Sequence, residues 1–389
     1  MAEEAAEKIG DSDERGAFAG QVRYVSSMRG DENQQEAMFS YVNLDQRVPS
    51  NHPLRAIRKM ADQALAGLSS HFDALYARRG RPSKPPEQLI RALLLQVLYA
   101  IRSERQLMER IQYDLLFRWF VGLGIDEEEW DATVFTKNRD RLMKGEIAQR
   151  LLQAVMEQAR SQDLLSEEHF TVDGTILEAW ASRNSFGPKD PAPVVGTGAR
   201  GRKCLRDTPE SKTDPQARLY KKSTAGEVKP SYLGHVLIEN RNGLVVAARA
   251  TQSSATAERE AAVAMLDGMG LRPEKIPRSD RRMTLGADKS YQEQKFIEAL
   301  RKRHVAPHVA EYQPSAKWPN FLTEAERNDP GFAISQKKRK LVERVFGWGK
   351  LDSVMRKIKL HGLARVDWLF RFLVAAHNLV RMTKLIPAQ

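Results

Sequence analysis

The spacing of the apolar residues changes character between residues 162 and 170. From His52 to about Gln162 they recur at intervals of three and four, which is the period of an amphipathic helix. From Phe170 to Leu177 the sequence is instead rich in β-branched residues, which is typical of a strand. The sequence therefore predicts a helical N-terminal part followed by a part that is built around a sheet.

The second part contains a clear hairpin pattern. Two apolar runs, Tyr232–Ile238 and Leu244–Thr251, flank the turn residues Asn242 and Gly243. The patterns that follow alternate, and they predict a helix over 257–269, a strand over 282–288, a helix over 292–303, a strand over 305–309, a basic helix over 336–348 and an apolar helix over 366–385. Three strands in a meander, followed by alternating helices and strands, predict an α/β fold with a mixed sheet that helices cover.

Composition divides the chain into three predicted regions. Residues 1–38 are expected to be a disordered acidic leader, because the first 27 hold six acids against three bases and show little apolar periodicity. Residues 39–165 form the predicted helical domain, and 166–389 form the predicted α/β domain. Within the α/β domain, residues 183–230 carry eleven bases against five acids and are rich in Pro, Gly and Ser, which predicts an exposed basic insertion.

Overall charge narrows the class of partner. The chain has 62 Lys and Arg against 50 Asp and Glu, a net charge of +12, so nucleic acid is the first partner to consider. The single Cys204 cannot form an internal disulfide, which suits a reducing cytoplasm. The most apolar run, Leu89–Ile101, is too short to span a bilayer, so we expect a cytoplasmic protein with no membrane partner.

Two consecutive predicted helices could read DNA. The first carries Leu89 to Leu98, the second runs from about Gln106 to Val121, and they join near Ser103; the expected polar positions hold Arg102, Arg105, Arg110 and Arg118. This arrangement suits a helix-turn-helix DNA-binding unit. An ordinary helical bundle with solvated arginines fits the same pattern, and the residues alone leave both interpretations open.

Three carboxylates are candidates for chemistry. Asp173 lies within an apolar strand, where burial of its charge is costly unless something compensates it. Asp288 ends a second apolar strand, and ligands gather at strand ends in open α/β sheets. Glu343 is the only acid among five bases on a predicted helix: Lys337, Lys338, Arg339, Lys340 and Arg344.

Two Asp and one Glu can together hold two divalent cations. Such a pair of ions activates a water molecule and stabilises a leaving oxygen in phosphoryl transfer. The alternative for Glu343 is a plain salt bridge, and the alternative for Asp288 is a turn residue. The bases near Glu343 favour a role in DNA binding: on one continuous helix Arg339 would share the face of Glu343, and Lys350 would follow two turns later.

Residues 335–365 as a whole carry ten bases against two acids, with Phe346 and Trp348 interleaved. This composition predicts phosphate contacts together with packing against bases or sugars. A solvated basic face with two core aromatics is the alternative.

Taken in order, these motifs resemble the DDE transposases of bacterial insertion sequences, in the branch called insertion-sequence family five. The resemblance covers the chain from about His52 to Leu385. Its carriers are Thr171-Val-Asp173-Gly-Thr, Gly286-Ala-Asp288-Lys-Ser-Tyr and Arg339-x-x-x-Glu343-x-x-x-x-x-x-Lys350. One departure is Gln336, which stands where the family signature has a Tyr, so the DNA contact of that Tyr is in question here.

The resemblance implies an RNase H-like catalytic domain behind an all-helical DNA-binding domain. It implies that Asp173, Asp288 and Glu343 are catalytic and hold two Mg²⁺ ions, which Mn²⁺ could replace. One site would then cut the element ends to give 3′-hydroxyl groups and join them to target DNA, with DNA contacts from Arg339, Lys350, Arg344, Lys337, Lys338 and Lys340. The helical domain would bind terminal inverted repeats, and a homodimer at the bacterial nucleoid would hold two ends.

Two rival functions fit the same residues. Another RNase H-like nuclease, such as a junction resolvase, would use the same carboxylates without any need for element ends. A domesticated or inactive transposase-derived DNA-binding protein would retain the carboxylates only as structure. Strand transfer in addition to cleavage would separate the transposase from both rivals.

Overall fold

A computed structural model of the chain describes residues 42–77, 79, 83–128, 130–187, 209–221, 226–270, 283–313, 319–351 and 355–386. The predicted acidic leader, residues 1–38, lies outside the described residues. Residues 188–208 and 222–225 of the predicted basic insertion lie outside them as well.

The N-terminal part is helical, as predicted. Its helices are α1 (Leu44–Arg47), α2 (Pro53–Ala66), α3 (Ser69–Leu75), α4 (Pro86–Leu98), α5 (Glu104–Tyr113), α6 (Leu115–Val121), α7 (Ala132–Lys144) and α8 (Ile147–Ser161). The prediction of one helix from about Gln106 to Val121 is wrong, because the segment divides at Asp114. The Asp114 carboxylate accepts the backbone N–H groups of Leu116 at 2.9 Å and Phe117 at 3.3 Å, and this cap starts a new helix.

Arg118 is not one of the solvated arginines that the pattern predicted. Its side chain is buried and donates to the carbonyl oxygens of Ile111 at 3.3 Å and Gly124 at 3.0 Å. The buried guanidinium therefore joins the end of α5 to the segment that follows α6. Arg102, Arg105 and Arg110 are exposed, as predicted.

The α/β part is built on one mixed sheet. Its strands are β1 (His169–Ala179), β4 (Arg218–Tyr220), β5 (Lys229–Glu239), β6 (Val245–Gln252), β7 (Met283–Ala287), β8 (Val305–Val309) and β9 (Lys357–Ile358). The order is β4-β5-β1-β7-β8, with β6 also paired to β5 and β9 to β1. β1, β5 and β6 are antiparallel neighbours, whereas β7 and β8 run parallel to β1. This is the predicted mixed sheet: a meander of three strands followed by strands parallel to the first.

The predicted hairpin is confirmed between β5 and β6. Gly243 has φ of +74°, a left-handed conformation that favours glycine. The buried Glu239 carboxylate accepts the backbone N–H groups of Arg241 at 2.9 Å, Asn242 at 2.7 Å and Leu244 at 3.0 Å. The turn is therefore held by one acid as well as by its glycine.

The described end of the predicted insertion is not a plain exposed loop. β2 (Phe186–Gly187) pairs with β3 (Glu210–Ser211) as a separate two-stranded sheet, and β4 joins the main sheet. Asp214 is buried and accepts from the Tyr232 hydroxyl at 2.7 Å and from the Gly362 N–H at 3.2 Å. Buried polar contacts thus fix residues whose sequence suggested only a loop.

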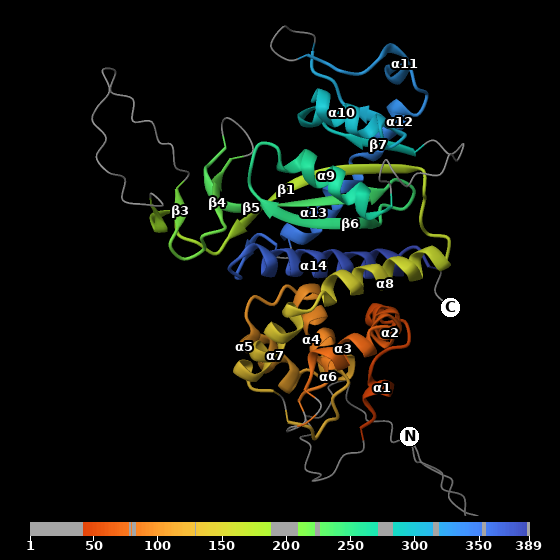
Figure 1. Ribbon diagram of the computed structural model, residues 1–389. Helices are drawn as coiled ribbons and strands as arrows, with labels where there is room; N and C mark the ends of the chain where they lie inside the picture. The colour runs from red at the N-terminus through yellow and green to blue at the C-terminus, as the bar shows by residue number, and fades with distance from the viewer. Residues whose placement is uncertain are drawn as a thin grey trace, which may run out of the picture. The chain divides into compact units, whose positions relative to one another are not determined.

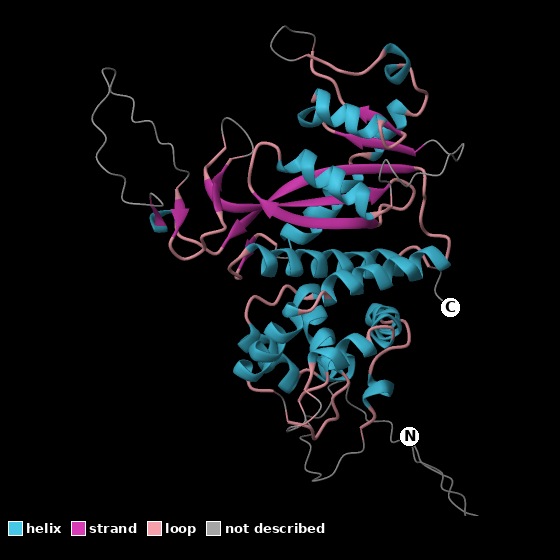
Figure 2. Cartoon of the chain, in the orientation of Figure 1, coloured by secondary structure: helices cyan, strands magenta, loops and turns pink. Residues whose placement is uncertain are grey.

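Helices cover both faces of the sheet (Figures 1 and 2). On one face, α9 (Ala257–Gly268) and α10 (Gln294–Arg301) form an apolar core with Phe170 and Val172 of β1. On the other face, α13 (Leu341–Leu351) and α14 (Leu363–Thr383) pack near Leu177 and Ala179. α11 (Glu324–Arg327) and α12 (Phe332–Lys338) lie between β8 and α13 in the chain. Successive side chains of β1 point to opposite faces of the sheet, so this strand contributes residues to both cores.

The last helix, α14, contacts both parts of the chain. It lies along the sheet and beside α8 in Figure 1. Asn378 donates to the carbonyl oxygen of Val245 in β6 at 2.8 Å and to the sulfur of Met156 in α8 at 3.2 Å. A Cβ at Gly234 would lie 2.8 Å from the Phe370 ring, so only glycine lets the sheet and helix approach this closely. The helices and the sheet share one apolar core through α14.

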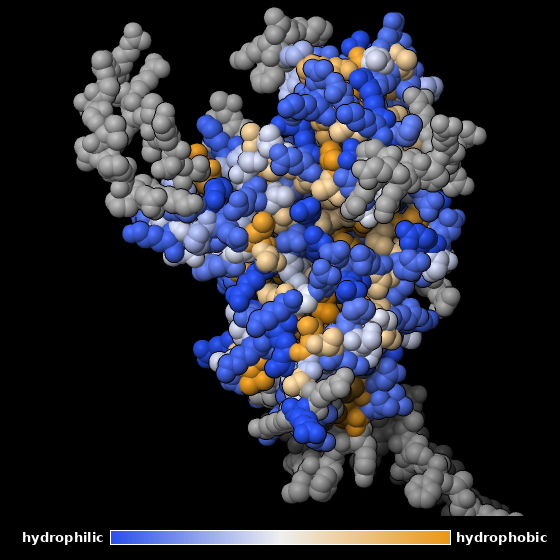
Figure 3. Space-filling model, viewed as in Figure 1, coloured by the Kyte–Doolittle hydropathy of each residue, from blue (hydrophilic) through white to orange (hydrophobic). Residues whose placement is uncertain are grey.

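Within the described residues, no helix has the length and apolar character needed to cross a membrane. The face in Figure 3 is mostly hydrophilic, with apolar residues in small separate patches.

Candidate active site

Asp173 and Asp288 occupy matching positions on neighbouring parallel strands. Thr171 of β1 pairs with Gly286 of β7, and each aspartate follows two residues later. Both side chains are half-buried. Since matching residues of parallel neighbours lie side by side, this register places Asp173, within β1, next to the carboxyl end of β7, where Asp288 follows.

The Asp288 carboxylate is held by the short 3₁₀ helix that follows it, Lys289–Tyr291. One of its oxygens accepts from the Ser290 backbone N–H at 2.8 Å and from the Ser290 hydroxyl at 2.5 Å. These bonds fix the direction of the carboxylate without neutralising its charge.

Three carboxylates act electrostatically on the buried Tyr291. Its ring is fully buried, and burial raises the pKa of its hydroxyl well above 10.0, with further contributions from the carboxylates of Glu258, Asp173 and Asp288. Among the described residues the Tyr291 hydroxyl has no hydrogen-bond partner.

Glu258 is a site residue that the sequence did not single out. It lies in the first turn of α9, where it is 8% exposed, and accepts the Ser290 hydroxyl at 3.2 Å. A Cβ at Gly174 would be 2.9 Å from its other oxygen, so this glycine leaves the space that Glu258 fills. Acids are common in the first turn of any helix, because they interact well with its dipole, so no sequence signal marked Glu258.

The predicted third acid, Glu343, lies in the first turn of α13 and is exposed. α13 packs against β1, the strand that carries Asp173. Among the described residues, however, no group of three His, Cys, Asp or Glu side chains is close enough to hold a metal ion. Glu258 shares the Ser290 hydroxyl with Asp288 and lies beside Gly174, the residue after Asp173, whereas Glu343 is exposed on α13.

The basic helix predicted over 336–348 is two helices. α12 ends at Lys338 and α13 begins at Leu341. Between them the N–H groups of Val342 and Glu343 bond to the carbonyl oxygens of Arg339 and Lys340, three residues back rather than four, at 3.1 and 3.2 Å. The prediction that Arg339 and Glu343 share one helical face is therefore wrong. Arg339 is half-buried, whereas the other predicted DNA-contact residues are exposed: Lys337, Lys338, Lys340, Arg344 and Lys350.

Gln336, which stands in place of the signature Tyr, anchors α12 to the sheet. Its amide donates to the carbonyl oxygens of His308 at 2.6 Å and, more weakly, of Ala287 at 3.5 Å. Ala287 immediately precedes Asp288. Beside it, the Ser335 hydroxyl lies 2.7 Å from the Nδ1 atom of His308. In this chain the position therefore holds α12 against the strand ends.

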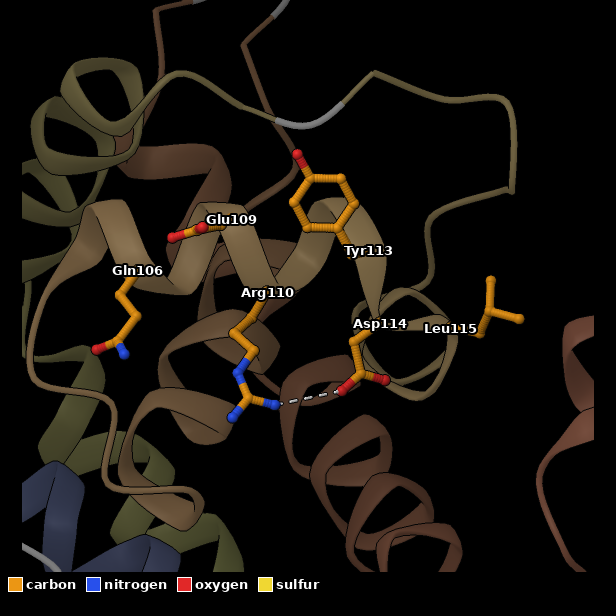
Figure 4. Close-up of a pocket in the computed structure, with 6 residues that line it drawn as sticks. All are labelled: Gln106, Glu109, Arg110, Tyr113, Asp114 and Leu115. Carbon is orange, nitrogen blue, oxygen red and sulfur yellow. Dashed lines mark ion pairs between the residues drawn. The ribbon is translucent and has the colours of Figure 1, made fainter.

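The helical region has a shallow hollow beside α5 (Figure 4). It is lined by Gln106, Glu109, Arg110, Tyr113, Asp114 and Leu115. Arg110 forms an ion pair with Asp114 at 3.8 Å, and the Tyr113 side chain is 73% exposed. A second hollow borders the neighbouring face of α5, next to Trp130, and shares Glu109 with the first. The surface of α5 thus offers both cations and aromatic area.

Comparison with protein families decides the class of the protein. Residues 167–379 match a family model described as "Transposase DDE domain", which spans more than half of the chain. The chain belongs to the DDE transposase family. Residues 42–141, within the helical region, match a second family model described as a transposase domain of the DUF772 type. This transposase is therefore a metal-dependent enzyme that cleaves DNA and transfers strands. The finer assignment to insertion-sequence family five stays a prediction.

Solved structures offer only a weak likeness. The piggyBac transposase synaptic complex with hairpin DNA is 9% identical over 85% of this chain and 75% of the other, with a TM-score of 0.39. The Mos1 strand transfer complex is 12% identical over 76% and 86%, with a TM-score of 0.19. The Mos1 mariner paired end complex with Mn is 14% identical over 84% and 85%, also with a TM-score of 0.19. No curated protein sequence matches the chain significantly. The assignment to the family depends on the family models alone.

Proposed function

We propose that this transposase binds the terminal inverted repeats of an insertion sequence, cuts a phosphodiester at each end to leave a 3′-hydroxyl group, and joins that end to target DNA. Asp173, Asp288 and Glu343 are the catalytic carboxylates. The observation that carries the proposal is the matching placement of Asp173 and Asp288 on parallel neighbours β1 and β7.

The carboxylates suit a hard divalent cation. Asp173 and Asp288 offer oxygen ligands, and Mg²⁺ prefers carboxylate oxygens together with water. In this proposal Asp173, Asp288 and Glu343 hold two Mg²⁺ ions, and Mn²⁺ substitutes for them. When bound, such ions lower the pKa of the attacking hydroxyl and stabilise the leaving oxygen. Because no group of three such side chains among the described residues is close enough to hold a metal ion, this proposal requires the three carboxylates to move closer together when DNA and metal bind.

The basic residues around α12 and α13 position the DNA. Lys350 and Arg339 direct the phosphates toward the carboxylates, and the exposed bases nearby add charge: Lys337, Lys338, Lys340 and Arg344. The exposed arginines at α5 make this helix the surface for the terminal repeat. We further propose that a homodimer holds the two ends and acts at the nucleoid in the bacterial cytoplasm.

The experiment that tests the proposal is a cleavage and strand-transfer assay on DNA that carries the flanking terminal repeats. Asp173→Ala and Glu343→Ala should each lower cleavage by about 1,000-fold or more and leave end binding nearly unchanged, because each removes a metal ligand and no base. Glu324→Ala, which removes an exposed acid of α11, is the matched control and should retain full activity.

The assay also separates the rival functions. Cleavage without any strand transfer would indicate an RNase H-like nuclease. Tight binding by the wild-type protein with no chemistry in Mg²⁺ or Mn²⁺ would indicate an inactive DNA-binding protein. Equal loss of binding and cleavage in Glu343→Ala would refute its assignment as a metal ligand.

A further inference from the structure

Trp180 is an exposed aromatic residue at the far end of the catalytic strand. It follows Ala179, the last residue of β1, and 44% of it is exposed to solvent. The ammonium groups of Lys357 and Lys359 lie 5.0 and 5.5 Å from the centre of its ring. Nucleic-acid binding sites commonly combine an exposed aromatic ring, on which a base can stack, with cations that contact the phosphates.

The fold fixes this arrangement through strand pairing. β9 pairs in parallel with the end of β1, so that Glu178 lies opposite Lys357 and Ala179 lies opposite Ile358. Ile358 is buried and anchors β9, while the lysines on either side of it remain exposed. The register therefore places both lysines next to Trp180. We call these three residues the Trp180 patch.

Positive charge exceeds negative charge around the Trp180 patch. The Glu178 carboxylate lies 3.6 Å from Lys357 and 3.5 Å from Lys229. Lys229 also pairs with Glu227 at 3.6 Å, and Glu227 pairs with Arg183 at 3.5 Å. Among these described residues two carboxylates are shared by three cations, and Lys359 adds a fourth, so the surface attracts an anion.

The patch also borders the helical region. The Lys359 ammonium donates to the carbonyl oxygen of Arg102 at 3.1 Å. Arg102 directly precedes Ser103, the residue that caps α5. One line of basic residues thus leads from the end of β1 to the start of α5.

We propose that the Trp180 patch is a DNA-binding site of this transposase, separate from the carboxylates. The two lysines contact phosphates, and the Trp180 ring packs against a base or sugar of the bound strand. This inference rests on the proposed function, in which α5 holds the terminal repeat. Trp180 lies seven residues beyond Asp173, about 23 Å along a strand that rises about 3.3 Å per residue. That distance equals about seven nucleotides of one DNA strand, so the patch contacts DNA away from the cut.

The test compares the binding of terminal-repeat DNA by the full chain, measured by fluorescence anisotropy at several salt concentrations. Trp180→Ala should weaken binding about 10-fold. Trp180→Phe should retain most of the wild-type affinity, since a phenyl ring still stacks. The double variant Lys357→Gln/Lys359→Gln should lower the slope of log affinity against log salt by about two, since each lost phosphate contact contributes about 0.9.

The matched control is Lys295→Gln/Lys302→Gln, which removes two exposed lysines at α10 and should leave affinity and slope unchanged. Duplexes with and without a single-stranded overhang distinguish stacking of Trp180 on a base from its packing against a sugar. An effect of Trp180→Ala confined to the overhang indicates base stacking, and an equal effect on both duplexes indicates packing against sugar.

Unchanged affinity in Trp180→Ala together with an unchanged salt slope in the lysine double variant would overturn the proposal. A loss in Trp180→Ala that Phe does not restore, accompanied by a lower melting temperature, would overturn it too, since Trp180 would then be structural. Wild-type protein that binds but does not cleave would refute the proposed active site and leave this test intact. Wild-type protein that does not bind the repeats would overturn both.

Discussion

At the scale of single residues, the candidate site is held by hydrogen bonds to its carboxylates. The Ser290 hydroxyl lies 2.5 Å from the Asp288 carboxylate and 3.2 Å from that of Glu258. One hydroxyl thus lies between a proposed metal ligand and a buried acid on another helix. Residues that orient a ligand in this way commonly set the affinity of a site for its metal.

Ser290→Ala should therefore raise the Mg²⁺ concentration needed for half-maximal cleavage by about 10-fold, within the range that outer-shell substitutions produce. Ser290→Thr keeps a hydroxyl and should recover most of the affinity. A titration of cleavage rate against Mg²⁺ measures this, and a Mg²⁺ titration followed by thermal melting gives a readout that is independent of activity. An unchanged metal requirement in Ser290→Ala would show that the hydroxyl does not position Asp288.

The sequence could identify some of these residues and not others. The strand positions of Asp173 and Asp288 were predictable, because β-branched and apolar residues mark both strands. Glu258 was not, since its burial depends on the absence of a side chain at Gly174, which lies far away in the chain. The burial of Arg118 was not predictable either, because its partners are backbone carbonyl oxygens, which no sequence pattern marks.

At the scale of helices and strands, periodicity predicted the elements well and their interruptions poorly. The strands and the hairpin follow the predicted order because alternation of apolar residues is set locally. The breaks at Asp114 and after Lys338 depend on capping bonds and a single tight turn, and apolar residues continue on both sides of each. The helix that carries Glu343 is consequently free to pack independently of α12.

The interface between α13 and α14 predicts a pH dependence of stability. His377 of α14 lies edge-on to Trp348 of α13, with ring centres 5.4 Å apart, and burial lowers the pKa of His377 from 6.5 to about 4. Between these values the unfolded chain binds more protons than the folded one. The stabilisation by the neutral imidazole is thus complete above pH 6.5 and is lost as the pH falls toward 4.

This loss should amount to about 2 kcal/mol between pH 7 and pH 5. Urea unfolding of the wild-type protein and of His377→Phe at both pH values measures it, since phenylalanine keeps a ring against Trp348 and has no proton to gain. Between pH 7 and pH 5, the free energy of unfolding should fall by about 2 kcal/mol less in His377→Phe than in the wild-type protein. Equal pH dependence in the two proteins would show that His377 titrates normally.

At the scale of the whole molecule, α14 makes the helical region and the sheet parts of one core. Phe370 is fully buried against Gly234 of the sheet, while Arg371, the next residue, donates to Gln149 of α8 at 2.5 Å. Phe370→Ala should therefore destabilise the protein by about 3–5 kcal/mol. Both parts should unfold in one transition at a lower temperature, whereas Ile334→Ala, at an exposed site, should change little.

Calorimetry together with hydrogen exchange of amides in α4 and in β5 measures this coupling. Two separate transitions, or loss of protection in β5 alone, would show that the two parts are stable independently.

The place of α14 in the chain has a consequence for synthesis. A ribosome produces α8, β5 and β6 well before Leu363–Thr383, the segment that packs against all of them. Until α14 is made, the apolar surfaces of α8 and of the sheet that it covers remain exposed, and such surfaces bind chaperones. A stop codon or frameshift before residue 363 would therefore remove the core that the N-terminal helices share with the sheet, so neither part of a shortened product should fold stably.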